Sequence, residues 1–576
     1  MTEPPHPRLS KPIHEERVVK VICIGAGLSG LALAYKLRRS FTNFELVIYE
    51  KNEGISGVWF ENKYPGCTCD IPAHSYCYSF EPKTDWTSVY APAAEIRQYF
   101  EDFAEKYELN RYIKLKHQVT EAIWNASSGE WNLSVKRAED NSIIQDKCHI
   151  LINAMGALNS WKWPNIPGIE TFKGKLVHSA NWDENLDLQD KTVGLIGNGA
   201  SGIQILPAIY PQVRKITHFI RSATWVAPPL AGPQRFYTEE EKLGFRNNTD
   251  SHLEYRKAQH LGLHKLFPVM VHDSEEQKMA AQMMGQAMKS MLPEHLHDVL
   301  VPDYDVGCRR LTPGFPYLQA LAGEKSSVVV GEIKQITEGG CVDGDGKEHA
   351  FDVLICATGF DTSFSPQFPI IGENGVKLDE AWKEEVKDYM GVGVAELPNY
   401  FVVGGPSTPI SAGPAVYMFG GSIPKRVLRS KTDKNSELQV EYILKMVDRY
   451  QTENIHSFAP KREAVEDYVC YRDHFMKGSV WSQGCRSWYK SQSSGKVSGL
   501  WPGNALHFVA ALSEPRFEDW EYKYQGNRFW YFGNGRSQVE KDEPEVADWA
   551  FYLRKEDNSD YLSRRLRLAA LTAKKA

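Results

Sequence analysis

Three positions in this 576-residue chain carry side chains that could take part in chemistry: Asp70, the pair Arg309-Arg310, and His178. Asp70 stands among apolar and aromatic residues, where a carboxylate needs a cationic partner because burying it unpaired is costly. The two adjacent arginines follow a turn, a pattern that by itself is typical of a surface pair. His178, taken alone, is better explained as a hydrogen-bonded structural histidine than as a catalyst. Their roles depend on the elements that position them.

The first of these elements is a glycine loop from Gly25 to Gly30, which follows the apolar run 18–24. A helix is expected from Leu31, and a second apolar strand, 45–49, ends in Glu50. This strand–loop–helix–strand–acid order predicts a dinucleotide site, in which the pyrophosphate meets a helix N-terminus and the acid binds ribose hydroxyls. Because an acid suits a free ribose 2′-hydroxyl, the ligand is expected to be FAD or NAD rather than NADP.

A second glycine loop runs from Gly197 to Gly202, after the apolar strand 191–196. The next strand, 216–220, ends in Arg221-Ser222 instead of an acid. A cation at this place accommodates a 2′-phosphate, so NADPH is predicted as the second ligand. Two such loops indicate a chain that holds two dinucleotides.

The segment after Glu50 favours FAD at the first site. It contains Gly57-Val-Trp59, then Tyr64-Pro-Gly66, then Asp70. One interpretation is an aromatic loop that covers a core. The other is that Trp59 packs against a flavin ring, because the segment follows the ribose-binding acid where the ribityl chain and ring of FAD would extend.

Composition excludes several other classes of protein. The net charge of -6 argues against nucleic acid as the main partner, and no apolar run reaches membrane-spanning length. No secretory signal is recognised, so a cytoplasmic protein is expected. The only close cysteine pair is Cys67-Thr-Cys69, which matches neither a metal ribbon nor a dithiol site, so no metal is expected and most of the ten cysteines are predicted to be small buried side chains.

Two sets of motifs resemble Baeyer–Villiger monooxygenases. The flavin-proximal stretch of that family reads Gly-x-Trp, Tyr-Pro-Gly and then Asp, as it does here up to Asp70. The family fingerprint, Phe-x-Gly-x-x-x-His-x-x-x-Trp followed by Pro or Asp, is filled at every position by Phe172, Gly174, His178, Trp182 and Asp183. In the family this fingerprint lies in a linker between domains, away from the chemistry.

The resemblance implies an α/β fold with two Rossmann-like dinucleotide-binding domains, the NADP domain being inserted into a discontinuous FAD domain. The FAD domain is expected to comprise residues 1–157 and 351–576, with a mobile lid loop around 485–500. The NADP domain is expected over 158–350. Its composition at about 233–301 predicts a helical insertion, whose methionine stripe is interpreted as core or channel lining rather than a metal site.

Matched position by position, the resemblance assigns the catalytic role to Arg310, partnered by a buried Asp70, and a contact with NADP to Arg309. It implies FAD contacts from Gly25, Gly27, Leu28, Ser29, Gly30, Glu50, Lys51, Gly57, Val58, Trp59, Asp70, Ile71, Tyr76 and Val119. It implies NADP contacts from Thr68, Gly197, Asn198, Gly199, Ala200, Ser201, Gly202, Gln204, Arg221, Ser222, Arg309 and the lid residue Trp488.

The reaction implied by the resemblance begins with hydride transfer from NADPH to FAD. O2 then gives a C4a-peroxyflavin, which inserts one oxygen atom next to a ketone carbonyl to form an ester or lactone. Three alternatives remain at this stage. A flavin N- or S-oxygenase shares both loops, a disulfide reductase needs a flavin-adjacent cysteine pair, and a non-catalytic flavin redox sensor needs neither a lid nor an active-site arginine.

Overall fold

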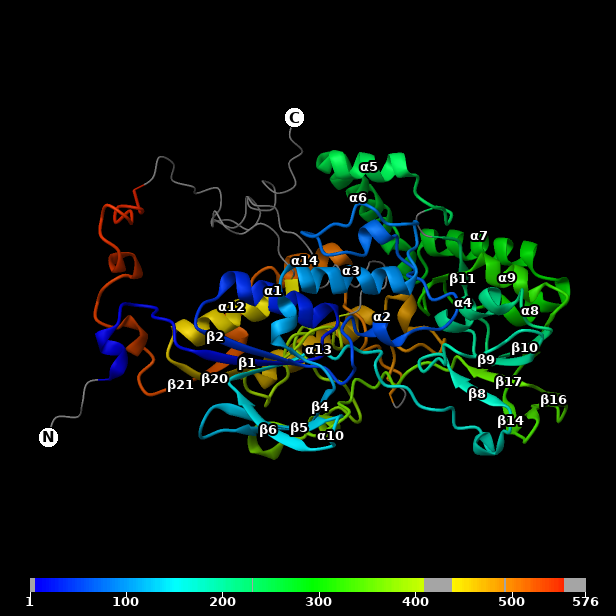
Figure 1. Ribbon diagram of the computed structural model, residues 1–576, viewed down its shortest axis with the longest axis horizontal. Helices are drawn as coiled ribbons and strands as arrows, with labels where there is room; N and C mark the ends of the chain where they lie inside the picture. The colour runs from blue at the N-terminus through cyan, green and yellow to red at the C-terminus, as the bar shows by residue number, and fades with distance from the viewer. Residues whose placement is uncertain (1–5, 230–231, 409–437, 492–493, 554–576) are drawn as a thin grey trace.

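The computed structural model describes residues 6–229, 232–408, 438–491 and 494–553. Two parallel five-stranded sheets lie towards opposite ends of the molecule (Figure 1). The first, in the order β19-β7-β1-β2-β3, contains β1 (Val19–Ile24), β2 (Phe44–Tyr49), β3 (Ile113–Lys114), β7 (Ile150–Asn153) and β19 (Tyr400–Val402). The second, in the order β13-β10-β9-β17-β8, contains β8 (Lys175–His178), β9 (Thr192–Ile196), β10 (Lys215–Ile220), β13 (Ser326–Val330) and β17 (Val353–Cys356).

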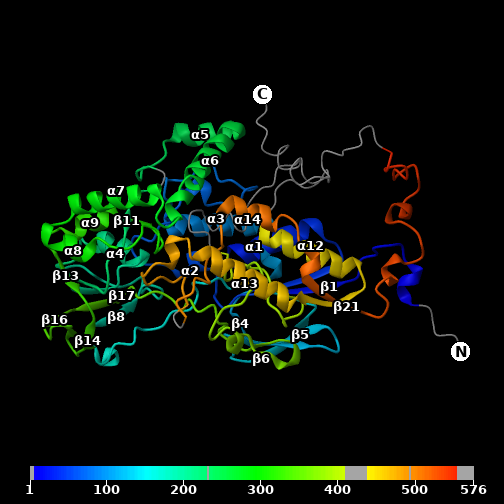
Figure 2. The ribbon, with the colours of Figure 1, turned by 180° about the vertical axis from the view of Figure 1, so that it is seen from behind.

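Successive side chains of β1 point to opposite faces of the first sheet, and because they are apolar, a hydrophobic core packs against each face. Val19, Val21 and Cys23 join a core shared with helices, whereas Ile22 and Ile24 join a core shared with antiparallel strands. Helices therefore cover one face, and a separate sheet, antiparallel except for the pairing of β18 with β4, covers the other (Figures 1 and 2). The covering elements are α1 (Leu28–Ser40), α3 (Ala93–Lys106), α12 (Leu438–Thr452), β4 (His117–Asn125), β5 (Glu130–Arg137), β6 (Ile143–Cys148) and β18 (Ile370–Ile371).

The second sheet is layered in the same way. Val353 and Ile355 of β17 join the core on the helical face, and Leu354 and Cys356 join a smaller core on the other face. The surrounding elements are α4 (Ala200–Ile209), α7 (Glu275–Met291), α9 (Phe315–Leu321), β14 (Ile333–Ile336), β15 (Gly340–Asp343) and β16 (Glu348–Ala350). The predicted α/β fold with two Rossmann-like sheets is confirmed, and the second sheet is formed by residues between β7 and β19 of the first.

One expected boundary differs from the structure. The strand Val353–Cys356 was assigned to the returning half of the FAD domain, from residue 351, but it pairs with β8 and β9 inside the second sheet. The chain rejoins the first sheet only at β19. Parallel strands buried on both faces are uniformly apolar, so such a run carries no information about which sheet it joins.

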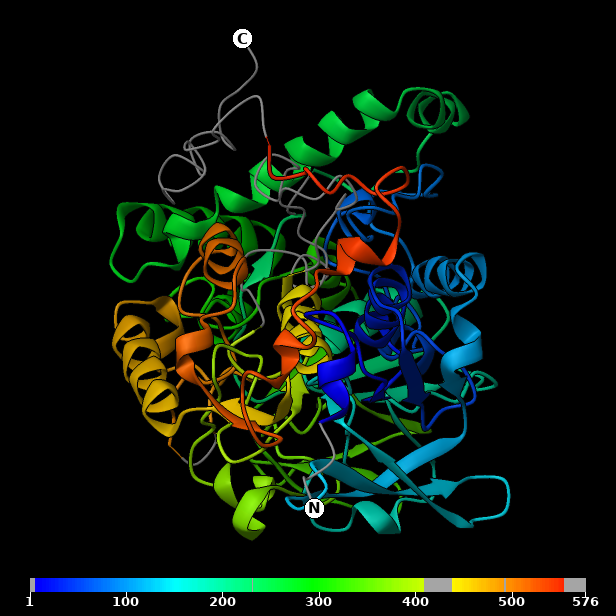
Figure 3. The same cartoon turned by 90° about the vertical axis from the view of Figure 1, so that its left-hand side faces the viewer.

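The region 233–301 is helical, as its composition predicts. It contains α5 (Glu239–Asn247), α6 (Thr249–His264), α7 and α8 (His297–Leu300). Figure 3 shows α5 and α6 (green) on the opposite side of the molecule from the antiparallel strands β4 to β6 (cyan). The methionines of α7 differ in burial. Met288 is buried, whereas Met279 and Met283 are exposed and are therefore not part of the core.

The remaining regular elements that the structure describes are short or lie near the C-terminus. They are α2 (Val58–Glu61), β11 (Val226–Ala227), β12 (Thr312–Pro313), α10 (Leu378–Ala381), β20 (Ile455–Pro460), α13 (Arg462–Met476), α14 (Ala505–Leu512) and β21 (Trp520–Tyr524). Within the described ranges, no helix has both the length and the apolar character needed to cross a membrane.

Buried polar contacts hold α6 against the segment that follows Asp70. Arg256 donates from Nε to the carbonyl of His74 at 3.0 Å and from Nη2 to that of Tyr78 at 3.3 Å. His74 Nδ1 lies 2.8 Å from His252 Nε2. Burial, reinforced by His252 and Arg256, lowers the pKa of His74 to about 3, and burial and Arg256 lower the pKa of His252 to about 4.

These two histidines predict a loss of stability in mild acid. Both are neutral when folded, but below their ordinary value of 6.5 they bind protons in the unfolded chain. Stability is therefore full above that value and falls as the pH drops towards 4, by about 1.4 kcal/mol per unit for each histidine. The urea midpoint, followed by tryptophan fluorescence, should fall between pH 7 and pH 5.

His252→Gln should flatten this pH dependence, whereas His474→Gln, at an exposed position on α13, should leave it unchanged. If the urea midpoint of the unsubstituted protein is the same at pH 5 as at pH 7, protonation of the two histidines does not destabilise the folded protein.

Candidate active site

Both glycine loops lie at the place where open α/β sheets bind ligands. The chain order reverses at β1, which has β2 on one side and β7 on the other, and again at β9, which has β10 and β17 as neighbours. Gly25 and Gly197 directly follow these strands, at the carboxyl edge where such sheets hold ligands. Helices α1 and α4 then begin with Gly27 and Gly199 as N-caps, so no side chain covers their terminal N–H groups.

The first loop leaves its backbone accessible to a pyrophosphate. A Cβ at Gly30 would lie 2.1 Å from the carbonyl oxygen of Gly25, so only glycine allows helix and loop to pack this closely. Gly27 faces Gly57, whose Cα would lie 3.6 Å from a Cβ there. Glu50 accepts hydrogen bonds from the N–H groups of Ala26 and Asn52, while its burial raises its pKa. The chemistry of this set fits the phosphate and ribose of FAD.

The predicted flavin-proximal residues gather after β1 and β2. Trp59 Nε1 donates to the Tyr76 hydroxyl at 3.2 Å, and the two rings meet edge to face. Val58 and Trp59 stand on α2, and Val119 lies in the core beneath the first sheet. Lys51 forms an ion pair with Glu61 at 3.0 Å.

Three cations, Arg221, Arg309 and Arg486, cluster at the end of β10. Arg309 Nη2 donates to Ser222 Oγ at 2.6 Å, and Arg309 Nε donates to the carbonyl of Arg486 at 2.7 Å. Burial and the charges of Arg486 and Arg309 lower the pKa of Arg221. Among the described residues, no ion pair joins any of the three to a carboxylate. This cluster of positive charge beside the second loop fits the 2′-phosphate of NADPH.

Asp70 and Arg310 meet between the two sheets. Arg310 Nε lies 3.9 Å from Asp70 Oδ2, so the predicted ion pair is present. It is not buried as expected, because the Arg310 side chain is 39% exposed and that of Asp70 12% exposed. Burial raises the pKa of Asp70, and the charge of Arg310 and a hydrogen bond from Gln204 oppose this rise. The guanidinium is thus anchored on one side and open on the other.

Gln204, on α4, fixes the orientation of Asp70. Its Nε2 donates to Asp70 Oδ1 at 3.2 Å and to the Thr68 carbonyl at 3.0 Å. The Tyr64 hydroxyl donates to Gln204 Oε1 at 2.9 Å, which determines which way the amide faces. The NADP half of the molecule therefore holds the aspartate of the FAD half.

Replacing Gln204 by leucine should lower oxygenated product per NADPH consumed. The loss of a hydrogen bond to a charged group is expected to reduce kcat about tenfold. Tyr64→Phe keeps the amide and should have a smaller effect. Product yield and NADPH consumption measured in parallel test this, and an unchanged ratio in Gln204→Leu would remove Gln204 from the positioning of Asp70.

The segment 485–491 covers Arg310 with aromatic side chains. Tyr489 is 1% exposed, and its burial raises its pKa despite the charge of Arg310. Trp488 contacts Tyr489 with ring centroids 4.6 Å apart, and both belong to an apolar cluster with Met270 and Val480. Of the predicted lid, residues 492–493 lie outside the described residues. This aromatic cover lies on one side of Arg310, whose side chain is still 39% exposed.

Known proteins similar to this chain place it in a family. A family model described as flavin-binding monooxygenase-like matches residues 18–232. The chain is 37% identical to the FAD-binding monooxygenase tazF of Aspergillus terreus, over 94% of this chain and 96% of that protein. It is 32% identical to a Baeyer–Villiger monooxygenase of Pseudomonas aeruginosa, over 86% of this chain and 89% of that protein. The chain belongs to the Baeyer–Villiger monooxygenase family.

The fold of this family member is shared with solved structures. A crystal structure of cyclohexanone monooxygenase from Rhodococcus sp. Phi1 bound to NADP+ superposes with a TM-score of 0.74, covering 88% of this chain and all of that one at 23% identity. An oxidised steroid monooxygenase bound to NADP gives 0.73, also at 23% identity. At this identity the likeness establishes the fold alone.

The family fingerprint has a structural role in this monooxygenase. Its first half is the edge strand β8, and a Cβ at Gly174 would lie 2.7 Å from the carbonyl oxygen of Asp352. His178 is fully buried, stacks on Trp161, and has its pKa lowered to about 4 by burial. Ala180 N–H donates to His178 Nδ1, so Nε2 carries the proton that is donated to Thr358 Oγ1 at 3.2 Å. The predicted structural histidine thus ties the fingerprint to the turn after β17.

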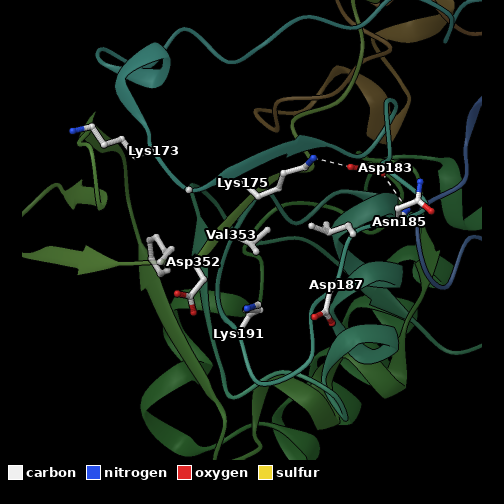
Figure 4. Close-up of a pocket in the computed structure, with 11 residues that line it drawn as sticks. Lys173, Lys175, Asp183, Asn185, Asp187, Lys191, Asp352 and Val353 are labelled. Atoms are coloured by element: carbon white, nitrogen blue, oxygen red, sulfur yellow. Dashed lines mark hydrogen bonds and ion pairs between the residues drawn. The ribbon is translucent and has the colours of Figure 1, made fainter.

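A cavity of about 620 Å3 opens against the same fingerprint (Figure 4). Lys175 and Asp183 pair across it at 2.7 Å. Lys191 and Asp352 lie beside it at the amino ends of β9 and β17, as Figure 4 shows. Because open α/β sheets bind ligands at their carboxyl ends, this cavity lies at the opposite edge from the chemistry.

Two features of the site were not predicted from the sequence: Tyr489 and the disulfide between Cys308 and Cys485. Tyr489 directly follows the predicted lid residue Trp488, so a sequence signal for it was available. The disulfide between Cys308 and Cys485 had no sequence signal, because the two cysteines are separated by 177 residues. Of the eight free cysteines, six are buried, as predicted, and Cys470 is exposed.

Proposed function

We propose that this chain is an FAD-containing, NADPH-dependent enzyme that converts a ketone and O2 into an ester or lactone, NADP+ and water. The proposal rests on one arrangement, the exposed side of Arg310 between the two dinucleotide loops, with Asp70 and Gln204 behind it. The first glycine loop with Glu50 would hold FAD, and the second loop with Arg221 and Arg309 would hold NADPH. The chemistry supplied by bound FAD is the transfer of electrons from NADPH to O2.

The contribution of the chain is placement, charge and exclusion of water. A ketone oxygen becomes negatively charged when its carbonyl carbon is attacked, and Arg310 provides a fixed positive charge beside it. Asp70 keeps the guanidinium in position and Gln204 keeps Asp70 in position. Trp488 and Tyr489 keep water away, so that the activated oxygen reaches the substrate instead of being lost as hydrogen peroxide.

The test is turnover under 18O2 with NADPH and panels of ketones and thioethers. The expected result is an ester or lactone carrying one 18O atom, with one NADPH consumed per product. Sulfoxides without any ester would replace the proposal by heteroatom oxygenation. NADPH consumption that yields only hydrogen peroxide with every ketone would contradict it.

A cytoplasmic site of action completes the proposal. Eight of the ten cysteines are free thiols, as expected in a reducing compartment, and NADPH is the reductant available there. Fractionation of the native cells with immunodetection tests this, and recovery in a secreted fraction would contradict it.

A further inference from the structure

Cys308 and Cys485 join the two loops that meet over the proposed reaction centre. They form a disulfide with Cα atoms 6.2 Å apart, across a sequence separation of 177 residues. Cys308 directly precedes Arg309 and Arg310, and Cys485 opens the segment that carries Trp488 and Tyr489. The bond therefore connects the arginine loop to the aromatic cover.

A lysine side chain lies beside both sulfur atoms of this pair. Lys490 Nζ lies 3.9 Å from Cys308 Sγ and 3.8 Å from Cys485 Sγ, and it also donates to the carbonyl of Cys485 at 2.9 Å. A second cation, Arg309, directly follows Cys308 and donates a hydrogen bond to the carbonyl of Arg486. Adjacent cations lower the pKa of a cysteine and make its thiolate the reactive form.

Three cysteines outside this pair have a raised thiol pKa. Burial raises the pKa of Cys341 and Cys356 to about 12, and the pKa of Cys67 to about 11. Those side chains stay protonated and unreactive. The pair beside Lys490 is itself buried, so its distinguishing feature is the neighbouring cation, whereas Cys470 is exposed and Cys67 is partly exposed.

Without the disulfide, the loops are held together by weaker contacts. These are the Arg309–Arg486 hydrogen bond and the contact of Tyr489 with Arg310, since the main-chain bond of Lys490 to Cys485 lies within the cover segment itself. Such contacts can break when a cover opens to exchange substrate and product. The disulfide does not break when the cover opens, so it holds the start of the cover segment on the arginine loop.

We propose that Cys308 and Cys485 are a redox-active pair that locks the aromatic cover over Arg310 when oxidised and frees it when reduced. The inference rests on the proposed function in one respect, the identity of the oxidant. Hydrogen peroxide, released when NADPH and O2 are consumed without oxygenating a substrate, accepts two electrons from the pair. One thiolate attacks a peroxide oxygen, giving a sulfenic acid and hydroxide, and the second sulfur displaces the sulfenic oxygen as water. In sum, two thiols and H2O2 give a disulfide and two waters.

The consequence is self-limitation of a wasteful reaction. Without substrate the enzyme produces peroxide, the pair closes, and exchange of NADP+ at the covered site slows. Turnover of the oxidised form should be about 3- to 10-fold lower, because opening of a cover commonly limits kcat. A thiol reductant should restore the original rate.

The experiment treats the full-length FAD-bound protein with stoichiometric hydrogen peroxide. Peptide mapping should recover Cys308 joined to Cys485, with the rate of NADP+ release and the hydrogen exchange of residues 485–491 both lowered. Dithiothreitol should reverse all three. Cys485→Ser and Cys308→Ser should show none of these responses, and Cys470→Ser, altered at an exposed position on α13, should respond like the unsubstituted protein.

Two results would overturn the inference: no Cys308–Cys485 peptide after peroxide treatment, or a disulfide that leaves NADP+ release and hydrogen exchange unchanged. If both serine variants unfold, the same comparison of oxidised and reduced unsubstituted protein decides the question. None of these readouts needs a ketone, so absence of ester formation would refute the proposed function while leaving the redox pair standing.

Discussion

Arg310→Ala is expected to abolish most ester formation, by on the order of 10²- to 10³-fold in kcat, as happens when a single donor to a developing oxyanion is removed. The guanidinium is partly exposed, with the Arg310 side chain 39% exposed, and its Nε lies 3.9 Å from Asp70 Oδ2. Product is measured by gas chromatography with a saturating ketone and NADPH. Reduction of FAD by NADPH without oxygen should stay within a few-fold of normal.

The comparison of variants separates charge from geometry. Arg310→Lys retains the charge on a shorter, non-planar group and should recover only part of the rate, because lysine cannot reproduce the guanidinium fork. Asp70→Asn keeps the shape of the side chain but removes the negative charge that attracts Arg310. The guanidinium should then be held less firmly in position, and kcat should fall by about tenfold. Full product formation by Arg310→Ala would refute its role outright.

Local chemistry explains why the glycine loops were predictable. Gly25, Gly27, Gly30 and Glu50 act within one strand–helix–strand unit, and their spacing is a direct consequence of backbone crowding at the loop. The same holds for Gly197 to Arg221. Such units identify two nucleotide sites without reference to the rest of the chain.

Contacts between distant segments were predictable only where a family resemblance linked them. Asp70 and Arg310 were matched in that way, and the structure brings them together but leaves Arg310 open. Gln204 was predicted as a contact with NADP, whereas its amide also bonds Asp70. Which group an amide reaches depends on how α4 packs against the other half of the molecule, and no sequence pattern encodes that distance.

The strand β17 and the pair Cys308–Cys485 could not be placed from the sequence, for two different reasons. The run Val353–Cys356 is apolar on both faces, so it suits either sheet equally, and only its hydrogen-bonded neighbours assign it. The two cysteines lie in unrelated loops, and their Cα distance of 6.2 Å arises from the packing of those loops. Spacing rules for cysteines apply to close pairs and are silent about such contacts.

Arg221→Ala should change the coenzyme preference of the enzyme more than its rate of chemistry. The expected result is a fall in kcat/KM for NADPH of about 10- to 100-fold, because one hydrogen bond to a charged group contributes about 1.5 to 3 kcal/mol. NADH lacks the 2′-phosphate, so its kcat/KM should be nearly unchanged. Steady-state consumption of each coenzyme with the same ketone measures both.

Arg214 provides a matched control at the other end of β10. It is an exposed arginine at the amino end of β10, 3.6 Å from Asp352, whereas Arg221 follows the carboxyl end. Arg214→Ala should leave both coenzymes unaffected. Equal losses for NADPH and NADH in Arg221→Ala would mean that the arginine supports the loop rather than the phosphate.

Arg309 should behave differently from Arg221, although both belong to the same cation cluster. Arg309 also donates to Ser222 and to the carbonyl of Arg486, so it links the NADP loop to the aromatic cover. Its replacement by alanine should raise KM for NADPH and lower kcat as well, since the cover loses an anchor over Arg310. A pure KM effect in Arg309→Ala, with kcat intact, would show that coenzyme binding and closure of the cover are independent, and would separate the charge cluster from the reaction centre that it borders.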